Sequence, residues 1–178
     1  IALDLNWRPT FWKKNVLPSS GPSKDQQLLV RSLIEKVDLL KLAAEEAYWF
    51  FSTTEPQKIS TSLPNKPAVF ITDGSKSVTW FINSKYGLTP SFNVEVLDST
   101  GAGDAFLAGL LHKLCSDPDL LKASSNVKHL DRINSVVRYA NASGALVCNG
   151  LGAIDPQPID TEVQKFLYQQ LEEKKTNY

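Results

Sequence analysis

The stretch Asp98-Ser99-Thr100-Gly101-Ala102-Gly103-Asp104-Ala105-Phe106 decides how this 178-residue chain is interpreted. Gly101 and Gly103 are separated by one residue, and an apolar pattern typical of a helix begins at Ala105. Glycine permits positive φ values and close backbone approach, and a helix N-terminus carries about half a positive charge. The stretch therefore predicts an anion-binding turn before a helix, with Asp104 in the first helical turn.

Asp104 is the candidate catalytic residue of this turn. A carboxylate there can accept a proton from a substrate hydroxyl while the backbone amides of Gly101, Ala102 and Gly103 hold a phosphoryl group. A simpler interpretation stays open, because an aspartate in a first turn often only binds helix amides, and two glycines often only make a tight turn.

Strand patterns precede the turn. Phe92, Val94 and Val96 alternate with polar residues, which predicts a half-buried strand that leads into it. A continuous apolar run predicts a strand over residues 68–72, and further strands are expected over 2–6, 38–42 and 78–82. We expect a second hairpin-like turn near Gly87.

Helical spacing of apolar residues predicts helices over residues 28–37, 43–51, 105–114, 133–148 and 161–173. Turn-forming residues predict a loop over 9–23 and a break at 64–67. Strands and helices thus alternate from end to end, which is typical of an α/β fold.

Composition narrows the classes of partner and compartment. The 19 basic residues balance 19 acidic ones, so we expect no nucleic acid and no membrane as partner. No apolar run approaches the roughly 20 residues that cross a bilayer. Cys115 and Cys148 lie in apolar helical patterns, which predicts buried free thiols and a reducing compartment, the cytoplasm or the plastid stroma. The chain lacks Met and opens inside a predicted strand, so we expect that an N-terminal portion precedes it.

Several other kinds of site are excluded by the residues present. The sequence contains no Gly-x-x-x-x-Gly-Lys-Ser/Thr loop, no complete dinucleotide fingerprint and no Gly-x-Ser-x-Gly elbow. His112 and His129 lack partners at metal-ligand spacing, which argues against zinc.

The stretch 98–106 resembles the C-terminal signature of the ribokinase-like (pfkB) carbohydrate kinases, and the resemblance extends along the whole chain, over what would be the C-terminal half of that family. It implies a ribokinase-like α/β fold, a mostly parallel sheet between helix layers, without the N-terminal part and the lid. Residues 1–178 would then form the nucleotide-binding portion of a single kinase domain. The resemblance implies that Asp104 activates a sugar hydroxyl, and that Gly101, Ala102 and Gly103 form the anion hole.

Two further stretches resemble phosphate-binding segments of the family. Residues 4–8, Asp-Leu-Asn-Trp-Arg, are similar to the Asp-Pro-Asn-x-Arg segment of fructokinase-like members, which implies that Asn6 and Arg8 lie near the phosphates. Leu5 replaces the usual proline, and an Asn turn with a surface arginine is the alternative.

Residues 72–76 are similar to a Thr-x-Gly strand end, which implies that Thr72 and Gly74 line the ATP phosphates and ribose. Ser77 replaces an expected glycine, and a plain hairpin turn is the alternative.

Residues 140–145 and 150–154 imply where the adenine base of ATP would bind. These resemble the helix and loop that close over the base, so Asn141 is a purine-side candidate and Gly152 a loop-wall candidate. The alternative is a stripe of small residues that serves only helix packing.

Metal sites are implied at two places. Glu46 resembles the glutamate that helps to organise hydrated Mg²⁺, although Ala43 stands where a polar partner is expected; a solvated helix face is the alternative. Asp98 and Thr100 resemble residues that bind a monovalent cation such as K⁺, and the alternative is a local hydrogen bond between the two.

The resemblance implies ATP-dependent phosphorylation of a small-molecule sugar, with fructose the favoured acceptor, ATP and Mg²⁺ as cofactors and possible use of K⁺. A homodimer through the lid is expected by the same resemblance. Two other functions stay open: a catalytically inactive, kinase-like scaffold that binds a partner, and a nucleotide-binding module without its own sugar site. We expect residues 1–178 alone to be inactive, because the family builds its acceptor site largely from N-terminal residues.

Overall fold

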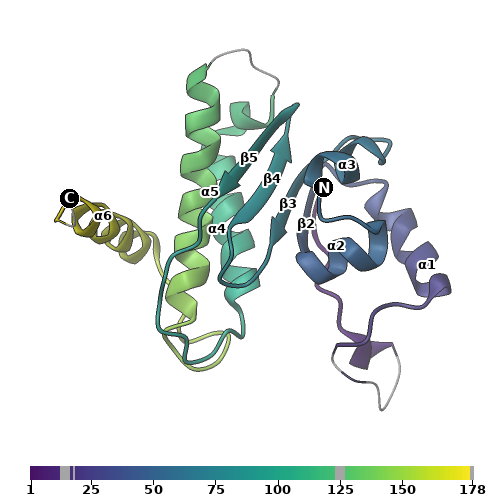
Figure 1. Ribbon diagram of the computed structural model, residues 1–178, viewed down its shortest axis with the longest axis horizontal. Coiled ribbons are helices and arrows are strands. Elements are labelled where there is room, and N and C mark those ends of the chain that lie inside the picture. Colours follow the sequence, from purple (N-terminus) through teal and green to yellow (C-terminus); the bar gives the residue numbers. More distant parts are fainter. Residues whose placement is uncertain (13–16, 18, 123–126, 177–178) are drawn as a thin grey trace. The chain divides into compact units, whose positions relative to one another are not determined.

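The computed structural model describes residues 1–12, 17, 19–122 and 127–176 (Figure 1). Contacts divide the chain into two compact units, residues 1–74 with 78–88 and residues 75–77 with 89–178. Among the described residues, no helix combines the length and the apolar character needed to span a bilayer.

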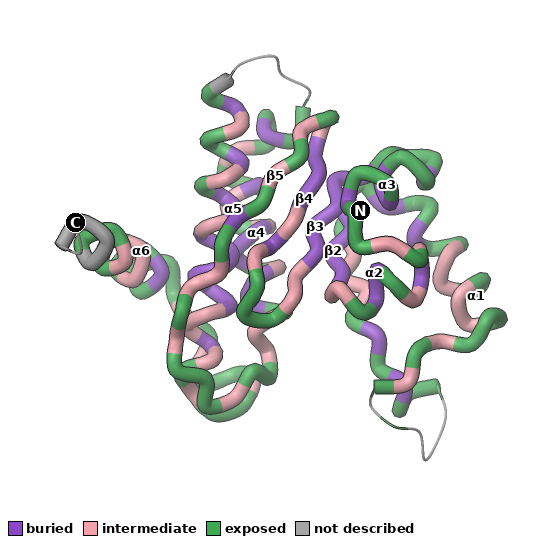
Figure 2. Tube along the Cα trace, in the orientation of Figure 1, coloured by how far each residue is buried: buried purple, intermediate pink, exposed green. Residues whose placement is uncertain are grey.

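The first unit contains a five-stranded sheet with strands in chain order. The strands are β1 (Ala2–Asp4), β2 (Leu39–Ala43), β3 (Ala68–Thr72), β4 (Val78–Ile82) and β5 (Lys85–Thr89). β1, β2 and β3 are mutually parallel, whereas β4 runs antiparallel to β3 with Phe70 opposite Trp80. Buried residues follow β2, β3 and β4 almost without interruption (Figure 2). Burial on both faces explains why these strands are mostly apolar.

Short helices connect the parallel strands of this unit: η1 (Pro9–Phe11), α1 (Lys24–Ile34), α2 (Ala44–Phe51) and α3 (Pro56–Thr61). α1 begins with a capping box, in which Ser23 and Gln26 exchange side-chain and backbone hydrogen bonds. One apolar core joins these helices to alternate positions of β2 and β3; its members include Ile34, Leu40, Leu42, Phe50, Ile59, Val69 and Ile71. This core fixes the ends of β1, β2 and β3 relative to one another.

The second unit is helical and contains α4 (Ala102–Ser116), η2 (Pro118–Leu121), α5 (Val127–Val147) and α6 (Asp160–Thr176). Figure 1 shows α4 and α5 side by side, and their packing depends on small residues. A Cβ atom on Gly109 would lie 2.6 Å from the Ser143 Oγ, and one on Gly144 would lie 2.9 Å from the Ala102 carbonyl oxygen. α5 therefore lies directly against the first turn of α4.

Three expectations are wrong in this structure. Residues 90–99 form no strand, although the apolar residues Phe92, Val94 and Val96 alternate with polar ones. An alternating segment forms a strand only where a neighbouring strand is available for backbone hydrogen bonds. The hairpin turn expected near Gly87 occurs instead at Asn83 and Ser84. Gly87 itself lies within β5, where the indole of Trp80 covers it and a Cβ atom would lie 2.0 Å from the ring. Cys115 is exposed and Cys148 partly buried, although both thiols are free as expected.

Candidate active site

The turn before α4 has the backbone geometry that its glycines permit. Gly101 is the N-cap residue, with φ 85°, and no side chain caps the helix there. The Ala102 N–H donates to the Ser99 carbonyl at 3.2 Å, and the Ala105 N–H donates to the Gly101 carbonyl at 2.9 Å. Within the described ranges, the amides of Gly101, Gly103 and Asp104 donate to no protein acceptor. Three backbone donors are thus left for an anion, and the expected Ala102 donor is already used.

Asp104 is the third residue of α4, and it is exposed. Its carboxylate makes no hydrogen bond or ion pair with any described residue, so it does not act as a helix cap. Two cavities of about 320 and 200 Å³ lie elsewhere, the first on α1 and α2 and the second between α4 and α5, and Asp104 lines neither. The carboxylate is therefore available to a molecule that approaches from solvent.

Asp98 holds this turn in place. One carboxylate oxygen accepts from the Thr100 hydroxyl at 2.7 Å and from the Thr100 N–H at 2.9 Å, and the other accepts from the Gly152 N–H at 2.9 Å. These bonds, the Thr100 hydroxyl foremost, lower the pKa of Asp98. The local bond to Thr100 was one of the two expected arrangements, and the bond to Gly152 adds a link from the turn to the loop after α5.

The loop after α5 lies close to the turn at a second point. A Cβ atom on Gly101 would lie 2.9 Å from the Ala153 Cα. Gly152 itself has φ 81° and open space around it, which is compatible with a residue in a loop that closes over a base.

Asn141 is buried in α5 and turned to the protein backbone. Its amide nitrogen donates to the Pro90 carbonyl at 3.1 Å and to the Thr89 carbonyl at 3.4 Å. This side chain therefore anchors the segment that follows β5, a role that the sequence does not indicate.

In the first unit, the other predicted residues gather where β1 and β3 end. Asn6, with φ 45°, and Arg8 follow β1 and are both exposed; the Arg8 Nη1 lies 3.4 Å from the Trp7 carbonyl oxygen. Thr72 ends β3 and its hydroxyl lies 3.4 Å from the Leu42 carbonyl oxygen, while Gly74 has φ 55° and open space around it. The carboxyl ends of parallel strands are where open α/β sheets bind ligands.

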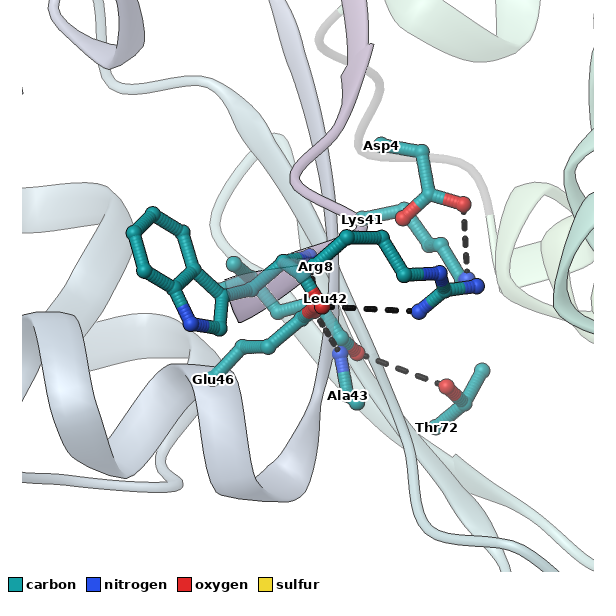
Figure 3. Close-up of polar contacts among 8 residues, drawn as sticks. Asp4, Arg8, Lys41, Leu42, Ala43, Glu46 and Thr72 are labelled. Atoms are coloured by element: carbon teal, nitrogen blue, oxygen red, sulfur yellow. Dashed lines mark hydrogen bonds and ion pairs between the residues drawn. The ribbon is translucent and has the colours of Figure 1, made fainter. Parts of the chain in front are cut away.

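Glu46 lies in the first turn of α2 and is buried, which rules out a solvated helix face. One carboxylate oxygen accepts from the Trp7 N–H at 2.6 Å, and the other accepts from the Ala43 N–H at 2.7 Å (Figure 3). Burial raises the pKa of Glu46, the two backbone donors oppose that rise, and the charge of Asp4 adds to it. Glu46 thus joins the segment after β1 to the end of β2.

A buried ion pair lies beside these residues, and the sequence analysis missed it. The Lys41 Nζ lies 2.8 Å from an oxygen of Asp4, and the two side chains are 8% and 11% exposed. Figure 3 shows Asp4, Lys41 and Arg8 extending to the same side, away from Glu46. The available signal was a lysine in the middle of an otherwise apolar strand.

The hydrogen bonds of Glu46 and Asp98 limit how these residues could bind a metal ion. Within the described ranges, no three His, Cys, Asp or Glu residues cluster as a metal site. Both oxygens of Glu46 and both oxygens of Asp98 already accept protein donors. Each carboxylate could therefore supply only part of a coordination shell; for Mg²⁺ near Glu46, waters and phosphate oxygens would supply the remainder.

Comparison with known proteins gives a consistent result. The model of the pfkB family of carbohydrate kinases matches residues 6–160. "Probable fructokinase-3" of Arabidopsis thaliana is 31% identical over 180 residues, which cover 99% of this chain and 48% of that protein. The chain thus spans about half the length of this curated relative.

Solved structures agree with the sequence relatives. A fructokinase from Xylella fastidiosa with bound ATP is 26% identical, with a TM-score of 0.73 over 94% of this chain and 51% of that one. A fructokinase double mutant from Vibrio cholerae O395, in fructose, ADP and potassium ion bound form, is 25% identical, with a TM-score of 0.70 over 92% of this chain and 49% of that one. The expected ribokinase-like fold, with its mostly parallel sheet, is confirmed for this part of the domain.

Proposed function

Because this chain belongs to the pfkB family of carbohydrate kinases, we propose that the protein transfers the γ-phosphoryl group of ATP to a sugar hydroxyl. Fructose is the proposed acceptor, since the relatives described above are named fructokinases. Residues 1–178 would form the nucleotide-binding portion of one kinase domain. The observation that carries the proposal is the exposed carboxylate of Asp104 beside backbone amides, since neither the carboxylate nor these amides has a hydrogen-bond partner among the described residues.

Asp104 would accept the proton of the sugar hydroxyl as its oxygen attacks phosphorus in line. The amides of Gly101, Gly103 and Asp104 would stabilise the charge on the transferred group, because preorganised donors need no reorganisation during the reaction. The proton passes from the hydroxyl to the carboxylate, and the γ-phosphoryl group passes from ATP to the sugar oxygen, with ADP as the leaving group.

Asn6 and Arg8 would contact the phosphates, Thr72 and Gly74 the phosphates and ribose, and Gly152 the base. For Asn141 the proposed purine-side role is indirect, because its amide already binds the carbonyls of residues 89 and 90. Mg²⁺ bound with ATP would neutralise phosphate charge, and Glu46 is the proposed residue that helps to organise it. Asp98 and Thr100 remain the proposed K⁺ residues, and a homodimer through a lid is proposed on resemblance alone.

The decisive experiment measures fructose-dependent ADP release by the natural protein and by its Asp104→Asn variant. Loss of the general base should reduce kcat by about 10²- to 10⁴-fold with little change in Tm. Asp25→Asn is the matched control, because Asp25 is also an exposed acid in a first helical turn, that of α1. Turnover by Asp104→Asn at the natural rate would contradict the proposal, and no turnover by the natural protein would favour the scaffold alternative.

A further inference from the structure

Lys41 is a buried cation that none of the proposed roles uses. It is the third residue of β2 and only 6% exposed, between Leu40 and Leu42, which are fully buried. In the parallel ladder it lies directly opposite Asp4, the last residue of β1, and their side chains form the 2.8 Å ion pair.

Stability does not explain why this pair is present. Removing two charges from water costs free energy that their attraction often fails to return, and apolar side chains of similar volume are frequently as stabilising or more so. An apolar residue at position 41 would also match the rest of β2. A buried ion pair at the ligand-binding end of a parallel sheet therefore requires another reason.

The pair belongs to a set of contacts that all hold the same segment. The Leu5 N–H donates to the Lys41 carbonyl at 3.1 Å, so Lys41 holds the end of β1 through its backbone and its side chain. Glu46 then holds the next turn through the Trp7 N–H at 2.6 Å. Between these points lies Asn6, whose φ of 45° needs such support, and directly after them lies Arg8.

We propose that Lys41 is a positioning residue for nucleotide binding: through Asp4 it fixes residues 5–8 so that Asn6 and Arg8 face the phosphates. This inference rests on the proposed kinase function. The energetic logic is preorganisation, since a segment that is ordered before binding loses less entropy when the nucleotide arrives.

The test compares four forms of the natural protein: wild type, Lys41→Met, Arg8→Met and the double variant. ADP affinity is measured by calorimetry and Tm by thermal unfolding. Lys41→Met should lower the Tm, because it leaves the Asp4 carboxylate buried without its partner, and the folded variant should bind ADP about tenfold more weakly. The double variant should be little weaker than Arg8→Met, because Lys41 acts through the segment that carries Arg8. Lys41→Arg should recover most of the affinity.

Backbone hydrogen exchange supplies a readout that does not depend on nucleotide. Lys41→Met should accelerate exchange at the amides of Leu5 and Trp7, while those of Val69 and Ile71 in β3 stay protected. Lys58→Met is the matched control, because the Lys58 side chain is 65% exposed on α3. If Lys41→Met fails to fold, Asp4→Asn removes the same pair with a smaller change of volume.

Each outcome decides the inference. ADP affinity unchanged in a folded Lys41→Met, losses that add in the double variant, or unchanged exchange at Leu5 and Trp7 would each overturn it while leaving the kinase proposal intact. If the wild type itself binds no ADP, the proposed function fails first and this inference fails with it.

Discussion

The carboxylate of Asp98 accepts a hydrogen bond from the Gly152 amide at 2.9 Å, although 54 residues separate the two in sequence. A neighbouring bond strengthens the same connection, since the Leu97 N–H donates to the Cys148 carbonyl at 2.8 Å. The turn that carries Asp104 and the loop proposed to contact the base are therefore one connected structure. Loosening the loop should disturb the turn.

Asp98→Asn should weaken this connection in a pH-dependent way. The pKa of Asp98 is lower in the folded protein than in the unfolded chain. The carboxylate therefore contributes its full stability above its pKa in the unfolded state, and this contribution is lost as pH falls through its pKa in the folded state. Thermal unfolding should show a lower Tm for the variant at pH 7 and a smaller difference below pH 3. An equal difference at both pH values would show that the charge of Asp98 is not involved.

Gly101→Ala should destabilise the protein more than Gly74→Ala does. Both residues have positive φ, which costs an alanine about 1–2 kcal/mol. Only Gly101 lies against backbone, with the Ala153 Cα 2.9 Å from the position of a Cβ atom, whereas Gly74 has nothing within 4 Å. Urea unfolding of the two variants measures the difference, and equal losses would mean that the close approach of the loop is not maintained in solution.

Gly87→Ala should be strongly destabilising because Trp80 occupies the space of the new methyl group. The Trp80 side chain is fully buried, so it has little room to move away. The double variant Gly87→Ala with Trp80→Phe should lose less stability than the sum of the single losses, since the smaller ring makes room. Additive losses in urea unfolding would contradict direct contact between the two positions.

Tyr139→Phe should raise the pKa of Asp160. In the folded protein this pKa is lowered to about 2, first by the Tyr139 hydroxyl at 2.7 Å and then by the Lys113 ammonium at 3.1 Å. The resulting stability is present above the unfolded pKa near 3.8 and is lost as pH falls toward 2. Carboxyl titration by NMR measures the shift directly, and Tm should fall at pH 7 with a smaller effect at pH 2.

Several elements follow directly from local sequence. The predicted strands over 68–72 and 78–82 coincide with β3 and β4, and the helix predicted over 105–114 lies within α4. These segments bury one or both faces along their length, so the apolar pattern records their burial. The glycine spacing before α4 likewise predicted a turn that requires positive φ, and Gly101 adopts it.

Other elements depend on contacts that no local pattern records. Chain reversal between β4 and β5 occurs at Asn83 and Ser84, which both have positive φ, and it lacks the usual glycine signal. Gly87 offers such a signal in the sequence, but in the structure it makes room for the Trp80 ring. The segment 92–96 has the pattern of a strand without forming one.

The amino-acid sequence by itself determined the type of protein, because a short run of residues around Asp104 specifies a turn, a helix start and a family. Only the tertiary structure decided what the buried charges do. Glu46 binds the Trp7 amide 39 residues away, and Lys41 binds Asp4 37 residues away. Partners at such separations are brought together by strand order and core packing, and their identity is therefore not contained in any local spacing of the chain.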